Sequence, residues 1–173
     1  MLHKIVCGCE LDGQKLMAVY AQSNAENAGS FYPEETDKKK AIQLVEAGFM
    51  NFLENDFLKQ EGTACWVLEE GDIWVSACRT CRVEPGLYYL EALETRPDSR
   101  GNGYAARLLQ GVCQALQAEG ACRICDCVGK GNTASLRTHQ KCGFQIVSEC
   151  GYDYGGKTSD DRDFGLEFCC KRS

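Results

Sequence analysis

One segment has the glycines and arginines that are typical of an anion-binding loop. Its sequence is Thr95-Arg-Pro-Asp-Ser-Arg-Gly-Asn-Gly-Tyr-Ala105. Gly101 and Gly103 have no Cβ atom, so the backbone there can approach a ligand closely. A helical pattern begins directly after Gly103, and the first turn of a helix presents unpaired N–H groups and the positive end of its dipole. Arg100 adds a formal positive charge. The segment therefore predicts a phosphate or pyrophosphate site.

A dinucleotide-binding loop is a competing interpretation of the same residues. Residues 101–106 match G-x-G-x-x-A, and Asp126 lies roughly where a ribose-binding acid is expected. In that motif the first glycine follows its strand almost directly, whereas here residues 95–100 intervene and include a proline. The strand before them also carries Glu91 and Glu94, where a buried parallel strand should be apolar. These departures disfavour the dinucleotide interpretation.

Two motifs at the right spacing resemble the GNAT-type N-acetyltransferases. Arg100-x-x-Gly103-x-Ala105 fits that family's [Q/R]-x-x-G-x-[G/A] signature, and residues 89–97 look like its fourth strand with a proline-containing loop. Residues 132–144, Asn-Thr-Ala-Ser-Leu-Arg-Thr-His-Gln-Lys-Cys-Gly-Phe, resemble its second motif, N-x-x-(A/S)-x-x-x-Y-x-x-x-G-F. The resemblance is specific over residues 86–145 and concerns only the order of elements elsewhere.

The resemblance implies acetyl-CoA, or another acyl-CoA, as the cofactor. In this family a bulge splays the fourth strand from the fifth, and the pantetheine arm enters the gap. Here the backbone of Leu93 and Thr95 would pair with the pantetheine and the acyl carbonyl. The other expected cofactor-binding residues are those of the loop and of the second motif: Arg100, Gly101, Asn102, Gly103, Tyr104, Ala105, Asn132 and Ser135.

The resemblance also implies direct transfer of the acetyl group to a primary amine in a ternary complex. An amine at neutral pH is mostly protonated, so a base must remove a proton. Glu91 is the first candidate, because a lone carboxylate on a strand covered on both faces is costly unless it is paired or used. Glu94 is a second candidate; it lies on the opposite face if side chains alternate, although a bulge would break the alternation.

His139 occupies the position where the family usually has a tyrosine that acts as general acid toward the leaving thiolate. This departure puts the acid step in question, although an imidazolium has a better placed pKa than a phenol for that role. The structural alternative is a histidine on a helix face with no catalytic contact. The functional alternative to an enzyme is a non-catalytic acyl-CoA-binding or sensing module on the same fold.

The amine acceptor is not readable from the motifs beyond a small molecule or a peptide. In this family the acceptor site usually involves the first helices and the loop before the last strand, here about residues 24–35 and 151–162. Their acidic and aromatic side chains would suit a cationic amine. The residues concerned are Asn24, Glu26, Asn27, Phe31, Tyr32, Tyr152, Asp153 and Tyr154.

Two further patterns match the motifs of a P-loop and of a zinc site. Residues 151–158 match G-x-x-x-x-G-K-[S/T], but no helical pattern follows and only fifteen residues remain, so a P-loop is disfavoured. Cys78-x-x-Cys81 and Cys122-x-x-Cys125-x-Cys127 have zinc-like spacing, yet they lie in strand patterns where residues i and i+3 point to opposite faces. We therefore expect no metal site.

The elements that position these residues follow from periodicity. Helices are expected over 13–23, 35–59, 103–118 and 132–141, and residues 24–33 are expected to form a loop. Strands are expected over 64–68, 73–83, 87–95, 121–127, 144–149 and 163–170, with a further short one over 4–9. This order predicts an α/β fold with a mixed, largely antiparallel sheet and helices on both faces, forming a single domain over residues 1–173.

Composition excludes several classes. The net charge of −6 is unlike that of a nucleic-acid binder, and no apolar stretch is long enough to span a membrane. The N-terminal residues show no apolar core of a secretory signal, so we expect a cytoplasmic protein. The thirteen cysteines are then interpreted mainly as small apolar side chains rather than as a disulfide scaffold. The sequence makes no prediction of the oligomeric state.

Overall fold

A computed structural model describes residues 1–152 and 158–170. The helices are α1 (Gly13–Val19), α2 (Ala21–Phe31), α3 (Lys38–Asn55), α4 (Tyr104–Ala118) and α5 (Thr133–Lys141), with short 3-10 turns at Gly8–Glu10, Phe57–Lys59 and Pro97–Ser99. The strands are β1 (Leu2–Ile5), β2 (Thr63–Glu70), β3 (Ile73–Glu84), β4 (Leu87–Thr95), β5 (Arg123–Gly129), β6 (Gln145–Ser148), β7 (Gly151–Tyr152), β8 (Thr158–Asp160) and β9 (Asp163–Cys169).

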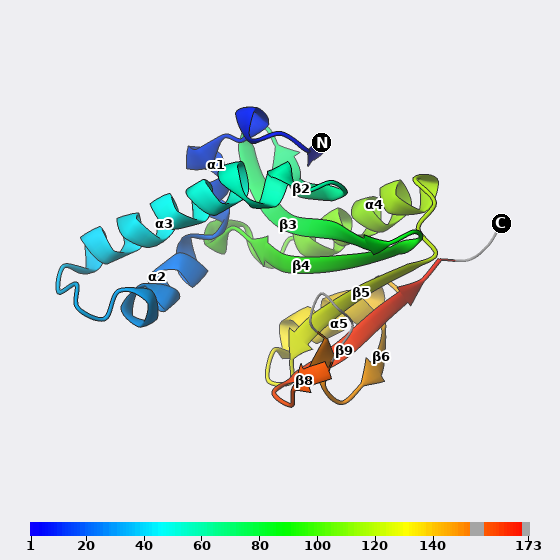
Figure 1. The fold of residues 1–173 in the computed structure, drawn as a ribbon. Coiled ribbons are helices and arrows are strands. Elements are labelled where there is room, and N and C mark those ends of the chain that lie inside the picture. The colour runs from blue at the N-terminus through cyan, green and yellow to red at the C-terminus, as the bar shows by residue number, and fades with distance from the viewer. Residues whose placement is uncertain (153–157, 171–173) are drawn as a thin grey trace.

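Seven strands form one sheet in the order β1-β2-β3-β4-β5-β9-β6, and β7 pairs with β8 separately. All neighbours in the large sheet are antiparallel except β4 and β5, which are parallel. The sheet opens at this parallel pair, so that β5, β9 and β6 diverge from β4 (Figure 1). The predicted mixed, largely antiparallel sheet is confirmed.

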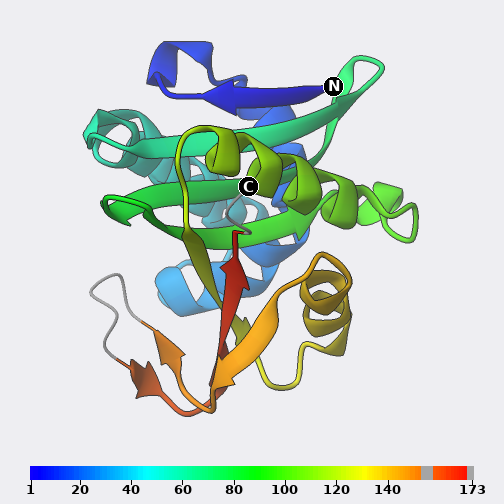
Figure 2. The ribbon, with the colours of Figure 1, turned by 90° about the vertical axis from the view of Figure 1, so that its right-hand side faces the viewer.

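Helices cover both faces of the sheet, and each face has its own core. Helices α4 and α5 lie on one face, with α1 to α3 behind the sheet in the same view (Figure 2). The α4 stripe of Leu108, Leu109, Val112 and Leu116 packs on that face, as its 3.6-residue period predicts. Alternation along β2 sends Trp66 to the α4 core and Val67 to the core beneath α1 and α3.

The N-terminal region differs from the sequence-based expectation. The helix expected over 13–23 is interrupted at Tyr20, and residues 24–31, expected as a loop, continue as α2. Asn24 and Ala28, four residues apart, are the buried positions of α2, so its inner face is small and polar rather than apolar. The apolar periodicity therefore gave no signal. The first strand also ends earlier, at Ile5, where a 3-10 turn follows.

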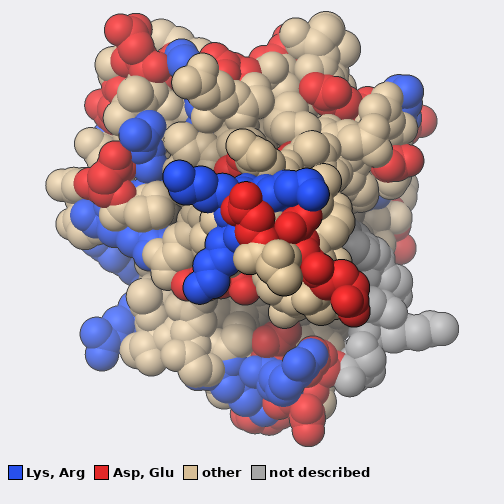
Figure 3. Space-filling model, turned by 90° about the vertical axis from the view of Figure 1, so that its left-hand side faces the viewer, with Lys and Arg blue, Asp and Glu red and all other residues tan. Residues whose placement is uncertain are grey.

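Charges of both signs lie over the end of the molecule formed by α2 and α3 (Figure 3). Lys40, for example, lies 2.7 Å from a carboxylate oxygen of Glu35. This face carries no extended field of one sign. In the part of the chain described, no helix is long and apolar enough to cross a membrane, and no group of three or more His, Cys, Asp or Glu residues has a metal-holding arrangement.

Candidate active site

A β-bulge in β4 organises the site. Ala92 has φ +53°, a left-handed conformation that is unusual for a residue other than glycine. The register of β4 against β3 shifts there, with Arg79 opposite Glu91 but Ala77 opposite Glu94. The Tyr20 hydroxyl donates a hydrogen bond of 2.9 Å to the Ala92 carbonyl and holds the bulge. The strained residue thus has a partner from the helical layer.

The bulge reverses the side-chain alternation of β4. Ala92 packs with the α1–α3 core, whereas Leu93 packs with the α4 core. Glu91 lies against Arg79 on the α3 side, and Glu94 returns to that side after Leu93. The sequence left open whether the two glutamates share a face; the bulge puts both on the face that α1 to α3 cover.

A cleft opens where β4 and β5 separate. The two strands pair only through Leu87–Tyr89 and Arg123–Cys125, so the later residues of β4 have no pairing to β5 on that side. The cleft has a volume of about 560 Å³. Its lining includes every residue expected to bind the cofactor except Asn102, and these are Leu93, Thr95, Arg100, Gly101, Gly103, Tyr104, Ala105, Asn132 and Ser135.

The start of α4 supplies the hydrogen-bond donors of this cleft. Gly101 and Gly103 have φ values of +80° and +75°, and a Cβ at either would meet nothing within 4 Å. Gly103 is the N-cap of α4 and offers no side-chain cap, so the first N–H groups of the helix stay available. Asn102 donates instead to the Ser99 carbonyl at 3.0 Å and shapes the loop. The arrangement fits an anionic ligand.

Basic side chains from two elements add to these donors. Arg100 lies in the loop, and its Nε donates to the Thr95 carbonyl at 3.2 Å. Arg137 and Lys141, four residues apart on α5, also line the cleft. We had not singled out either α5 residue; their shared helical face with the cleft-lining Ala134 and Thr138 was the available signal. The cleft is therefore cationic in a protein whose net charge is −6.

His139 lies away from the cleft, in the core between α5 and β5. Its side chain is 1% exposed, and its Nε2 lies 2.7 Å from Asp126 Oδ2. Its Nδ1 donates to the Ser135 carbonyl at 2.8 Å. Both ring nitrogens are therefore engaged, and the ring packs edge-on to Phe144. Burial lowers the pKa of His139, but the Asp126 carboxylate outweighs burial and raises the pKa overall.

Glu91 forms an ion pair in the opposite core. Its Oε1 lies 3.1 Å from Arg79 Nη2, and both side chains are largely buried. The Arg79 guanidinium lies 5.2–5.3 Å from the ring centroids of Phe49, Phe52 and Phe57. The charge of Glu91 is thus balanced, as in the structural alternative for this residue. Arg79 was missed in the sequence because it stands inside the zinc-like cysteine pattern.

Glu94 has a different environment. It lies 3.7 Å from Arg100 Nη2 across the end of β4. Burial raises the pKa of its carboxyl above the ordinary value; Arg100 opposes this rise, Glu26 adds to it, and a hydrogen bond from Ser23 opposes it. Glu94 lines the cofactor-side cleft and also a second cavity of about 550 Å³. No other residue belongs to the described linings of both.

The second cavity lies between α2, α3 and β4. Four of the residues expected at the acceptor site line it: Asn24, Asn27, Phe31 and Tyr32. Glu26 is not among the lining residues, although its charge acts on Glu94. Tyr152 lies at the other expected segment, in β7, whereas Asp153 and Tyr154, like most of the P-loop-like pattern, fall outside the described residues.

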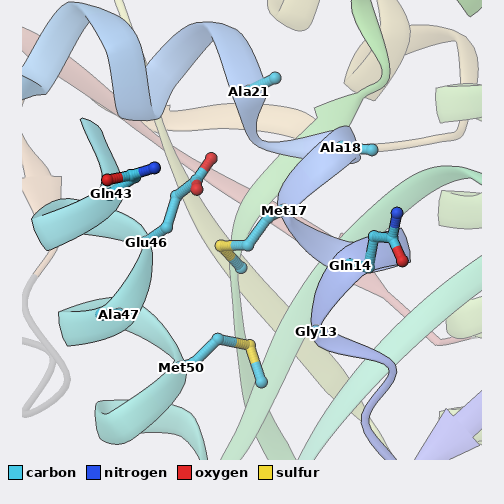
Figure 4. A pocket seen from close by; sticks show the side chains of 9 residues that line it. All are labelled: Gly13, Gln14, Met17, Ala18, Ala21, Gln43, Glu46, Ala47 and Met50. Carbon is cyan, nitrogen blue, oxygen red and sulfur yellow. The ribbon is translucent and has the colours of Figure 1, made fainter. Parts of the chain in front are cut away.

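A third hollow does not take part in this arrangement. It lies between α1 and α3, where Met17 and Met50 face each other (Figure 4). Its one charged lining residue is Glu46. It shares no lining residue with the cleft or with the second cavity. We therefore place the candidate site at the junction of the other two, at Glu94.

Comparisons with known proteins agree with this geometry. Residues 29–144 match the model of the acetyltransferase (GNAT) family. No curated protein matches the chain in sequence. Among solved structures, the chain is similar to the PaiA N-acetyltransferase of Thermoplasma acidophilum in complex with coenzyme A, with 13% identity, a TM-score of 0.68, and coverage of 98% of this chain and 99% of that one.

Two further structures show the same fold. A ribosomal-protein-alanine N-acetyltransferase from Brucella melitensis is 16% identical with a TM-score of 0.62, over 98% of this chain and 99% of that one. A streptothricin acetyltransferase from Bacillus anthracis in complex with acetyl coenzyme A is 18% identical with a TM-score of 0.55, over 68% of each chain. The likeness extends to the whole chain in the first of these two and to the shared part in the second.

Proposed function

The chain belongs to the GNAT acetyltransferase family, and from that premise we propose that it transfers an acetyl group from acetyl-CoA to a primary amine by direct attack in a ternary complex. The observation that carries the proposal is the meeting of two cavities at Glu94. One cavity is lined by backbone donors and cations, and the other by aromatic and polar side chains. An acyl donor and an amine acceptor would then approach the same carboxylate from opposite sides.

The cleft residues fit a coenzyme A ligand. Its phosphates require donors and positive charge, and the start of α4 with Arg100, Arg137 and Lys141 supplies both. Its pantetheine arm carries amides, and the backbone of Leu93 and Thr95 faces the side of β4 that lacks pairing to β5. When bound there, acetyl-CoA supplies an activated acetyl thioester. Its complexes with neighbours of this fold support the same choice.

Glu94 is the base in this proposal. Its carboxylate accepts the proton that the acceptor ammonium must lose, and its raised pKa suits that role at neutral pH. The Arg100 guanidinium, 3.7 Å away, holds the carboxylate in place. Glu91, the first candidate from the sequence, positions Arg79 instead. His139, the candidate acid, holds α5 to β5 through Asp126, so we assign no acid to the described side chains.

The alternative function is an acyl-CoA-binding or sensing module without catalysis. The specific observation that favours it is the absence of His139 from the cleft lining. Consumption of acetyl-CoA distinguishes the two functions, because only an acetyltransferase consumes it. Acetyl-CoA bound without consumption in the presence of a broad set of amines would favour the sensing module.

The first experiment is thermal unfolding with acetyl-CoA, CoA, NADH and ATP, each at about 1 mM. A ligand at 100 times its Kd adds about 2.7 kcal/mol, which raises the Tm by several degrees for a chain of this length. The proposal expects a rise with both CoA forms and a smaller or no rise with NADH and ATP. A rise with NADH alone would instead support the dinucleotide interpretation of the loop.

A further inference from the structure

The second cavity carries an inference about the acceptor, and this inference rests on the proposed function. We propose that the preferred acceptor is a monoamine with an apolar body, such as an alkylamine or an arylalkylamine, rather than a polyamine or a peptide N-terminus. The argument uses the charges that face the cavity, its aromatic wall and its size.

One acidic residue lines the cavity. This residue is Glu94, at the end where the cavity meets the cofactor-side cleft. The one cation in the lining, Arg79, is balanced by Glu91 at 3.1 Å. A single ammonium therefore finds one carboxylate, next to the position where transfer takes place. A polyamine would bring further ammonium groups, and these would meet no second carboxylate among the lining residues.

Aromatic rings form much of the remaining wall. Five aromatic side chains line the cavity: Phe31, Phe49, Phe52, Tyr20 and Tyr32. Phe49 and Phe52 also lie 5.3 Å from the Arg79 guanidinium, measured to their ring centroids, and form one wall with it. Phe31 is 68% exposed and Phe52 is 37% exposed, so that part of each ring surface is free to contact a ligand. The wall thus favours an apolar body.

The polar side chains of the cavity come from one helix. Ser23, Asn24 and Asn27 lie on α2, and the Ser23 hydroxyl donates to the Tyr20 carbonyl at 3.0 Å. Asn24 is buried, and its amide donates to the Met17 sulfur. These groups are the uncharged polar side chains that α2 adds to a cavity with one carboxylate, Glu94. A volume of about 550 Å³ lies within the range of roughly 300–1,000 Å³ for small-molecule pockets. The cavity therefore suits a compact ligand with one charged end.

The test compares kcat/KM at saturating acetyl-CoA for hexylamine, 2-phenylethylamine, ethylamine, spermidine and a tripeptide that begins with alanine. We expect hexylamine and 2-phenylethylamine to exceed spermidine and the tripeptide by about tenfold or more, since a few methylenes in an apolar pocket give differences of this size. Preference for spermidine or for the tripeptide would overturn the inference while leaving the proposed function intact. Bound acetyl-CoA with no amine consumed would overturn both.

Variants of the aromatic rim make the test specific. Phe31→Ala should raise the KM for hexylamine by about tenfold and leave the KM for ethylamine nearly unchanged, because the short amine does not reach the ring. Phe31 is largely exposed, so its loss should not prevent folding. Ile73→Ala is the matched control, since Ile73 is 41% exposed on β3 and lines neither cavity. Equal KM values for hexylamine in Phe31→Ala and in the wild type would contradict the inference.

Discussion

The two carboxylates of β4 differ in their partners although only two residues lie between them. Glu91 faces a guanidinium in a largely buried ion pair. Glu94 has a more distant cation and lies at the boundary of two cavities. A carboxylate in a buried ion pair holds its cation in place, whereas one at a cavity boundary is available to take up a proton. This contrast assigns the two residues different parts.

Substitution of Glu94 tests the assigned base. Glu94→Gln should lower kcat/KM by roughly 10²–10⁴-fold while the Kd for CoA stays similar. Burial raises the pKa of Glu94, so wild-type kcat/KM should fall as the pH drops through that raised value and the carboxylate becomes protonated. Arg100, Glu26 and Ser23 are the groups that act on this titration. The measurement is a pH profile of kcat/KM.

The acidic limb of that profile should be absent in Glu94→Gln. A limb that persists there would assign the titration to another group. Glu91→Gln is informative beside it, because it strands Arg79 in the core and should lower the free energy of unfolding by about 3 kcal/mol. If Glu91→Gln instead folded with wild-type stability and lost all turnover, Glu91 rather than Glu94 would be the base.

Glycine 103 has a matched counterpart outside the site. Gly103→Ala should lower the free energy of unfolding by about 1 kcal/mol, because φ is +75° there, and should also weaken CoA binding through a Cβ in the cleft. Gly71→Ala, with φ +60° in the β2–β3 turn, has the same backbone cost but lies away from the cleft. Titration calorimetry with CoA separates the two effects. Equal CoA affinities in both variants would contradict the assigned role of Gly103.

Among elements, α5 depends on a buried pair for its position. Asp126 on β5 and His139 on α5 are both almost fully buried, and Ser135 occupies the other ring nitrogen. The pair joins the helix that carries Arg137 and Lys141 to the strand beside the cleft. Because the Nδ1 proton is committed to a carbonyl, one further proton is shared between Nε2 and the carboxyl group.

This pair has a signature in stability against pH. The folded-state pKa of His139 is raised, so above the unfolded value of roughly 6.5 the folded protein keeps a proton that the unfolded chain has lost. The free energy of unfolding should therefore fall as pH rises from that value through the raised pKa. Asp126→Asn should remove this dependence and cost about 3 kcal/mol. Denaturant unfolding at several pH values measures both, and an unchanged slope in Asp126→Asn would refute the linkage.

Helices and strands could be predicted where the apolar periodicity was strong. Site residues could be predicted where they lie close together in the sequence. The α4 stripe and the glycine loop were found because their residues are close in the chain. Helix α2 was missed because its buried positions are Asn24 and Ala28. The burial of His139 could not be predicted, because its partner, Asp126, lies thirteen residues away on another element. The bulge was expected from the family resemblance, but its position at Ala92 had no local signal, since Tyr20 holds it from far along the chain.

For the whole molecule, the sheet opens between β4 and β5 beside the two cavities to which we assign the acyl donor and the amine. The cationic cleft lies with α4 and α5 on one side, and the aromatic cavity lies with α2 and α3 on the other. The bulge at Ala92 lies two positions before Glu94, which lines both cavities. A net charge of −6 coexists with a cationic cleft because the cleft lining has three cations, Arg100, Arg137 and Lys141, and one carboxylate, Glu94.

The most direct test measures the release of free thiol from acetyl-CoA in the presence of 2-phenylethylamine. The mass of the product amine is measured in the same reaction. Glu94→Gln is measured in parallel. The account predicts thiol release that requires the amine, an acetylated amine in equal amount, and a large loss of rate in Glu94→Gln despite bound CoA. Thiol release that is independent of any amine, or an undiminished rate in Glu94→Gln, would contradict it.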